Sequence, residues 1–257
     1  MTINQLKSSI KDILCNDFTG GVLTKVFRKS LPDIRWRGYS FRLPDSGVSK
    51  TNVAAIFWGF YESAEIRLIQ KYIDGNSDVV ELGASIGIVS GHIASKLKPG
   101  RKIISVEANR KLVGNVEANL KKFAGRNVNF KVLNYAVQYH VAEVMMHISD
   151  DNTESSVDER MSGKGENVLV PAITLGQIIE SENLSDFTLV CDIEGSELEI
   201  ILYDMEALGR CRNMLIEVHP VSHEGVHYDK EELVDKLIRD HQFKMVERQG
   251  NVCYFER

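Results

Sequence analysis

The chain has 257 residues, of which 43% are hydrophobic and 26% charged, as expected for a globular protein with one sizeable core. Lys and Arg number 31 against 36 Asp and Glu, and the formal net charge of -5 argues against nucleic-acid binding through an overall basic field. No stretch approaches the roughly 18 consecutive apolar residues of a membrane span, and the first residues lack the apolar segment of a signal peptide. We therefore expect a cytoplasmic protein whose four cysteines, which lack metal-binding spacing, are reduced and mostly buried.

Residues 1–75 differ in pattern from the rest, and we expect them to form a helical extension or lid beside a domain that spans residues 76–257. Apolar residues recur at helical spacing at the start of the chain: Ile3, Leu6, Ile10, Ile13 and Leu14. Short strands or turns are expected in the proline- and glycine-punctuated stretch around IRWRGYSFRLP. A second helix is expected in SAEIRLIQKYI, with Ser63 as its N-cap.

Beyond this extension, short apolar runs alternate with helical patterns. The runs that predict strands are VVEL, KIISVE, VNFKVL, EVMMHI, FTLVCDI, NMLIEVH, FKMVER and NVCYFE. Alternation of strands and helices is typical of βαβ units in a mainly parallel sheet. The polar segment 149–167 has no periodicity, so we expect a surface loop there.

The segment VVELGASIG, residues 79–87, reads as a buried strand that runs into a tight turn and then a helix. Gly83 and Gly87 let the backbone approach a ligand closely, at the edge of the sheet where α/β folds bind ligands. Ser85 stands where the dinucleotide fingerprint G-x-G-x-x-G has the glycine that meets a pyrophosphate. A cofactor without phosphates is therefore favoured, and a tight connection with no ligand is the alternative.

The second strand, KIISVE, ends in Glu107. An acid at this position can accept hydrogen bonds from a ribose diol. Both NAD and S-adenosylmethionine carry that diol, so Glu107 indicates an adenosine cofactor without choosing between the two. A solvated acid at the end of a strand is the alternative.

Taken together, motifs in a fixed order resemble the FkbM family of S-adenosylmethionine-dependent methyltransferases over roughly residues 58–219. The motifs that carry the resemblance are WGFYE, VVELGASIG, VEANRKLVGNVEAN, TLGQIIE, CDIEGSELEII and LIEVH. Glu81 replaces the family's usual Asp, and Ala108 replaces a common Pro. The resemblance implies a class I methyltransferase fold, which is Rossmann-like α/β with a mostly parallel seven-stranded sheet and an antiparallel C-terminal strand. It also implies S-adenosyl-L-methionine as cofactor and O-methylation of a hydroxyl on a sugar or polysaccharide precursor or another small hydroxylated metabolite.

The resemblance assigns cofactor-binding residues as well. The methionine moiety would be lined by Glu81, Gly83, Ala84, Ser85 and Gly87, while Glu107 would hold the ribose. The adenine would be flanked by Ala108, Asn109, Asn134, Tyr135 and Ala136. Residues that would close over the cofactor are Tyr61, Glu62, Ser155 and Ser156.

Candidate catalytic residues end two strands of the predicted sheet. A hydroxyl acceptor must lose a proton, and Asp192 is the first choice as base or acceptor-orienting residue. We also expect Asp192 to contact the cofactor. Glu194 follows it, and His219 ends the neighbouring strand, where a neutral imidazole suits proton abstraction near pH 7. The alternatives are that Asp192 or Ser196 caps a helix and that His219 is a hydrogen-bonded strand terminus. We expect no metal, although Asp192, Glu194 and His219 together would suit a divalent ion.

Two other functions use the same sheet. An NAD(P)-dependent reductase would share Glu107, but the dinucleotide fingerprint and a Tyr-x-x-x-Lys pair are missing. A non-catalytic nucleoside-binding regulator is the other alternative, and acids at the ends of two strands count against it. The expected partner is a small-molecule or glycan acceptor, with no nucleic acid and no membrane, and a homodimer is left open.

Overall fold

The computed structural model describes residues 11–30, 33–36, 39–44, 48–123, 127–149, 155–156 and 165–257. The backbone alone is described for residues 26–30, 33–36, 39, 149 and 155–156.

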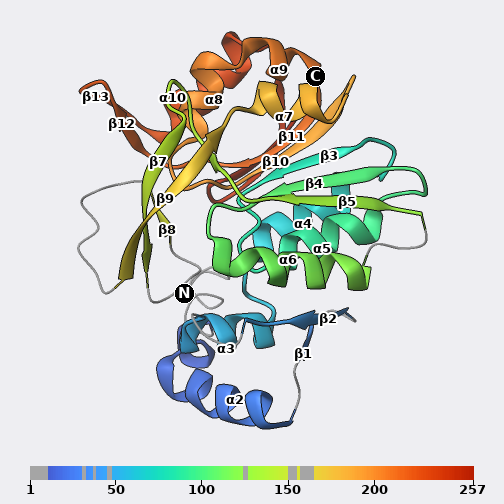
Figure 1. Ribbon diagram of the computed structural model, residues 1–257, viewed down its shortest axis with the longest axis vertical. Coiled ribbons are helices and arrows are strands. Elements are labelled where there is room, and N and C mark those ends of the chain that lie inside the picture. Colours follow the sequence, from blue (N-terminus) through green and yellow to red (C-terminus); the bar gives the residue numbers. More distant parts are fainter. Residues whose placement is uncertain are drawn as a thin grey trace, which may run out of the picture.

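A seven-stranded sheet forms the centre of the fold, in the order β14-β15-β11-β10-β3-β4-β5 (Figure 1). Its strands are β3 (Val79–Leu82), β4 (Lys102–Val106), β5 (Asn129–Leu133), β10 (Phe187–Cys191), β11 (Cys211–Glu217), β14 (Lys244–Gln249) and β15 (Val252–Glu256). The five strands from β5 to β11 are parallel, whereas β15 runs antiparallel to both β11 and β14. This order confirms the expected mostly parallel sheet with an antiparallel C-terminal strand.

Helices cover both faces of this sheet (Figure 1). One face carries α4 (Ser63–Tyr72), α5 (Ile88–Lys96) and α6 (Arg110–Phe123), and the other carries α7 (Leu175–Ser181), α8 (Glu197–Tyr203), α9 (Met205–Arg210) and α10 (Lys230–Arg239). Side chains alternate across a strand, so Val79 packs with α4 to α6 while Val80 packs with α7 to α10. Each face of the sheet therefore has its own apolar core.

The N-terminal residues form two further helices and a hairpin. They are α2 (Asp17–Ser30), β1 (Asp33–Trp36), β2 (Tyr39–Arg42) and α3 (Lys50–Trp58). The hairpin confirms the expected short strands, and α4 confirms the second helix, although its N-cap is Glu62 and Ser63 is its first residue. The expected first helix begins outside the described residues, where Ile3, Leu6 and Ile10 lie. Neither α2 nor α3 was expected.

A smaller sheet stands beside the carboxyl ends of the central strands. It consists of β6 (Ala136–Val137), β9 (Gly165–Ile173), β7 (Glu143–Ser149) and β8 (Ser155–Ser156), paired in that order, and a separate hairpin joins β12 (Val221–His223) and β13 (Val226–Tyr228). The strand β7 matches EVMMHI, but it does not belong to the central sheet. The expected surface loop at 149–167 was predicted to end too late. Its last residues belong to β9, which begins at Gly165 and pairs with β7.

The four cysteines are buried and free, as expected. No helix among the described residues is both long and apolar enough to cross a membrane.

Candidate active site

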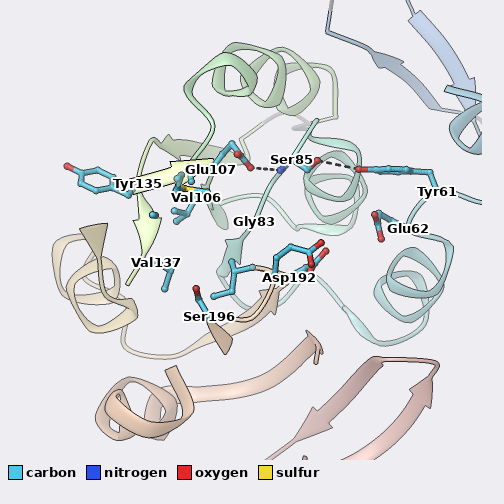
Figure 2. A pocket seen from close by; sticks show the side chains of 15 residues that line it. Tyr61, Glu62, Gly83, Ser85, Val106, Glu107, Tyr135, Val137, Asp192 and Ser196 are labelled. Atoms are coloured by element: carbon cyan, nitrogen blue, oxygen red, sulfur yellow. Dashed lines mark hydrogen bonds between the residues drawn. The ribbon is translucent and has the colours of Figure 1, made fainter. Parts of the chain in front are cut away.

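A cleft with about 780 Å³ of empty space opens at the carboxyl ends of β3, β4 and β10 (Figure 2). The lining residues are Tyr61, Glu62, Gly83, Ser85, Val106, Glu107, Ala108, Tyr135, Ala136, Val137, Met146, Asp192, Ile193, Glu194 and Ser196. The small sheet therefore contributes one wall, through β6 and β7, and the N-terminus of α4 contributes another.

The turn after β3 is pressed against the end of β10. Gly83 has a φ of 87°, and a Cβ on it would lie 1.7 Å from the carbonyl oxygen of Asp192. Its N–H and that of Ala84 both donate to the carbonyl of Val106 on β4. Gly87 has a φ of 77° and leaves no room for a Cβ beside Val116 of α6. Gly83 thus shapes the floor of the cleft, while Gly87 allows the turn to pack on α6.

Glu107 holds this turn from the neighbouring strand. Its two carboxylate oxygens accept the backbone N–H groups of Ser85 and Asn109, each at 2.7 Å. Burial raises the pKa of Glu107 to about 7. Figure 2 shows the Glu107 carboxyl next to Ser85 at the edge of the cleft. Each oxygen keeps a further lone pair, so the carboxylate can accept a ribose diol without releasing the turn.

The far end of the cleft is apolar. Ala108, Tyr135, Val137 and Met146 line it. The side-chain amide of Asn134 donates to the carbonyls of Glu107 and Ala108 and fixes the chain that follows β4. A flat, largely apolar ring such as adenine fits between these side chains.

The opposite end of the cleft is acidic. Asp192, which follows β10, faces Glu62 from the N-terminus of α4 (Figure 2). One oxygen each from Glu62, Asp192 and Glu217 lies within 4.8 Å of the others, and Asp192, Glu194 and His219 form a second such group. The structure therefore brings together the three predicted catalytic residues and adds two more carboxylates.

His219 is fixed by a buried carboxylate. Its Nδ1 lies 3.0 Å from Oε1 of Glu197, a side chain with no exposed surface that also accepts the N–H groups of Ile193 and Gly195. The other ring nitrogen, Nε2, lies 3.5 Å from Glu194 and 4.0 Å from Asp192. Glu197 thus orients both the ring and the turn that carries Asp192.

The pKa values in this cluster reflect crowded negative charge. Burial and then the charge of Glu62 raise the pKa of Asp192 well above its ordinary value. Burial, Glu217 and Glu194 raise the pKa of Glu62 to about 7. Burial lowers the pKa of His219, but the hydrogen bond and charge of Glu197 outweigh burial and raise it to about 9. The raised pKa favours the protonated imidazole, whereas the neutral form was considered as a base from the sequence.

Several predicted residues do not line this cleft. The carboxyl of Glu81 is buried under β4, where the hydroxyl of Ser105 donates to it, and Ala84 lines a smaller adjoining pocket. Gly87 and the buried Asn109 shape the loops behind the lining. Ser156 pairs with His147 through its backbone in β8, and its side chain is outside the described part of the chain.

Sequence reasoning missed Glu65 as a site residue. It lies on α4 with 2% of its surface exposed, and it lines the smaller pocket together with Glu62 and Asp192. The signal was available, because Glu65 falls on the same helical face as the apolar Ile66 and Ile69.

Comparison with known proteins assigns the class. Residues 81–250 match the methyltransferase FkbM domain, and the chain belongs to that family. It is therefore an S-adenosylmethionine-dependent methyltransferase, as the motifs predicted, and its cofactor is S-adenosylmethionine. No curated protein matches the sequence.

Several solved structures are similar at low identity. An O-methyltransferase from Bacillus cereus in complex with SAH is 15% identical, with a TM-score of 0.44, 98% of this chain covered and 97% of that one. Magnesium protoporphyrin IX methyltransferase from Synechocystis PCC 6803 with bound SAH is 13% identical, with a TM-score of 0.45 and coverage of 96% and 97%. Monomeric WbdD is 11% identical, with a TM-score of 0.40, 75% of this chain covered and 40% of WbdD. At such low TM-scores, the sheet order and the family match carry the assignment.

Proposed function

We propose that this methyltransferase transfers a methyl group to a hydroxyl of a sugar, a polysaccharide precursor or another small hydroxylated metabolite. The observation that carries the proposal is the cluster of Asp192, Glu194 and His219 at the end of the cleft opposite its apolar wall. A hydroxyl is a weak nucleophile while protonated, so its methylation needs a group that accepts or draws off the proton.

The rest of the cleft suits the cofactor. Glu107 would hold the ribose diol, the apolar wall of Ala108, Tyr135 and Met146 would hold the adenine, and the turn at Gly83 and Ser85 would lie along the methionine moiety. The sulfonium of S-adenosylmethionine supplies an activated methyl group. What the chain must add is an acceptor held in line with that methyl group and a path for the proton.

Asp192 is the proposed base or acceptor-orienting residue. Burial and the neighbouring acids raise the pKa of its carboxyl, which makes the carboxylate a stronger base than an exposed aspartate. His219, whose pKa is raised by its hydrogen bond with Glu197, would donate a hydrogen bond to the acceptor or to Asp192 in its protonated form. Glu197 holds both groups in place by its contacts with the His219 ring and with the backbone of Ile193.

Calorimetry and a methyl-transfer assay test this proposal. Asp192→Asn and His219→Ala are expected to bind S-adenosylhomocysteine within about threefold of the wild type, because the ribose and adenine contacts remain, and to lose methyl transfer to hydroxylated acceptors. Radiolabelled methyl transfer onto glycan precursors and fractionated cell extract identifies the acceptor. Normal turnover by both variants would refute the catalytic roles, and label found only on nitrogen or carbon would refute O-methylation.

A further inference from the structure

We propose that Glu62, Asp192 and Glu217 bind a divalent cation at the acceptor end of the cleft. These half-buried side chains come from the start of α4 and from the ends of β10 and β11, and one oxygen of each lies within 4.8 Å of the others. Two oxygens on opposite sides of a bound cation lie about 4.2 Å apart for Mg²⁺ and about 4.8 Å apart for Ca²⁺. Because three ligands cannot all lie opposite one another, the three oxygens are close enough for small side-chain movements to bring them to one cation.

Buried oxygens without partners point to a missing ligand. Oδ1 of Asp192 is shielded from solvent and has no hydrogen-bond partner. Glu65, which is 2% exposed, also has one carboxylate oxygen without a partner, and it borders the same pocket as Glu62 and Asp192. Buried polar atoms are nearly always paired, because an unpaired one costs free energy. A cation between these side chains would supply the partner that Asp192 lacks.

The charge balance supports the same conclusion. Glu62, Glu65 and Asp192 border one small pocket, and Glu194 and Glu217 each place a carboxylate oxygen within 4.8 Å of one from Asp192. Among the described residues, His219 is the only cationic side chain within 4.0 Å of Asp192 and Glu217. The ammonium group of one cofactor molecule would offset a single negative charge. A divalent cation offsets two more.

The donor set favours a hard cation. All three ligands are carboxylates, which suit Mg²⁺, Mn²⁺ or Ca²⁺ better than a soft metal. Three protein ligands leave coordination positions open toward the cleft, where the acceptor oxygen would bind, and this role rests on the proposed function. A bound cation favours the ionised form of an oxygen that it holds. Asp192 was considered above as a base or as an acceptor-orienting residue. If it binds the cation, its role is to orient the acceptor.

Manganese binding tests the inference without an acceptor or any turnover. Protein treated with EDTA and desalted is titrated with Mn²⁺ alone and followed by electron paramagnetic resonance. The wild type is expected to bind one Mn²⁺ per chain, and Glu217→Gln, which does not line the cofactor cleft, is expected to bind it at least tenfold more weakly. Glu206→Gln, an exposed acid on α9, is the matched control and should bind as the wild type does. Equal thermal unfolding of the three proteins shows that the fold is intact.

A second titration in saturating S-adenosylhomocysteine separates cation binding from cofactor binding. The inference holds if Mn²⁺ still binds, because the carboxylates then serve a metal and not the cofactor's ammonium group. It is overturned if no saturable Mn²⁺ site exists, if Glu217→Gln binds as the wild type does, or if S-adenosylhomocysteine displaces Mn²⁺. Binding of S-adenosylhomocysteine without any Mn²⁺ site would leave the proposed methyl transfer standing while this inference fails.

Discussion

The contact between Gly83 and the end of β10 predicts a large effect from one methyl group. In Gly83→Ala, the new Cβ would lie 1.7 Å from the carbonyl oxygen of Asp192 and 2.8 Å from its carbonyl carbon, so two backbone segments must separate. Gly100 has nearly the same φ, 85° against 87°, but nothing lies within 4 Å of the place that a Cβ would occupy there. Gly100→Ala therefore isolates the cost of the backbone conformation.

The two variants should differ by the cost of the clash. A left-handed conformation costs an alanine about 1–2 kcal/mol, which applies to both positions. Forcing an extra methyl group into packed structure adds about 1–3 kcal/mol at Gly83 alone. The free energy of unfolding should thus fall by about 2–5 kcal/mol in Gly83→Ala and about 1–2 kcal/mol in Gly100→Ala. Because the displaced turn at Gly83 and Ser85 would lie along the methionine moiety, only Gly83→Ala should also lose affinity for S-adenosylhomocysteine.

Urea unfolding measures the difference. With a denaturant slope of about 2 kcal/mol per molar urea, the midpoint should fall by about 1–2.5 M for Gly83→Ala and by about 0.5–1 M for Gly100→Ala. Calorimetry with S-adenosylhomocysteine gives the second readout. Equal midpoints for the two variants, or an unchanged affinity in Gly83→Ala, would show that the turn and β10 do not meet as described.

Two further predictions concern buried carboxyls. Glu107→Gln removes the charge that the ribose diol would contact, and S-adenosylhomocysteine should bind about 10–100-fold more weakly by calorimetry; unchanged affinity would place the ribose elsewhere. Burial raises the pKa of Glu81 to about 7, so between about pH 4.5 and 7 the folded chain keeps a proton that the unfolded chain releases, and stability falls as the pH rises. In Glu81→Gln the loss of unfolding free energy between pH 5 and 8 should be smaller by about 2–3 kcal/mol in urea titrations, and an identical pH dependence would contradict a buried ionisable Glu81.

Strand periodicity and the glycine turn predicted the central sheet well. The reason is that buried parallel strands such as VVEL and FTLVC are short, mainly apolar runs. The small sheet was harder to predict. In β9 the run GENVLVPAI begins with polar residues and has only one fully buried side chain, Val170, so its pairing with β7 depends on contacts that local sequence does not encode.

The site residues that could be predicted are those that directly follow strands of the parallel sheet. Glu107 follows β4 and Asp192 follows β10, the two strands on either side of β3, and topology alone brings both to the cleft. Glu197 was not assigned to the site, because its environment depends on three-dimensional packing. The raised pKa of His219 likewise follows from Glu197, which contacts it only after α8 and β11 have packed together.

Three of the eight non-glycine residues with positive φ in the described part of the chain line the cleft. Glu62, Ser85 and Glu194 have positive φ values of 43°, 48° and 53°, a region that residues other than glycine rarely adopt, and all three line the cleft. Each such conformation costs about 1–3 kcal/mol and persists only where surrounding contacts enforce it. For Ser85 the enforcing contact is visible, since its N–H donates to the buried carboxylate of Glu107. Glycine would adopt these conformations at a lower cost, whereas Glu62, Ser85 and Glu194 bring polar side chains to the lining of the cleft.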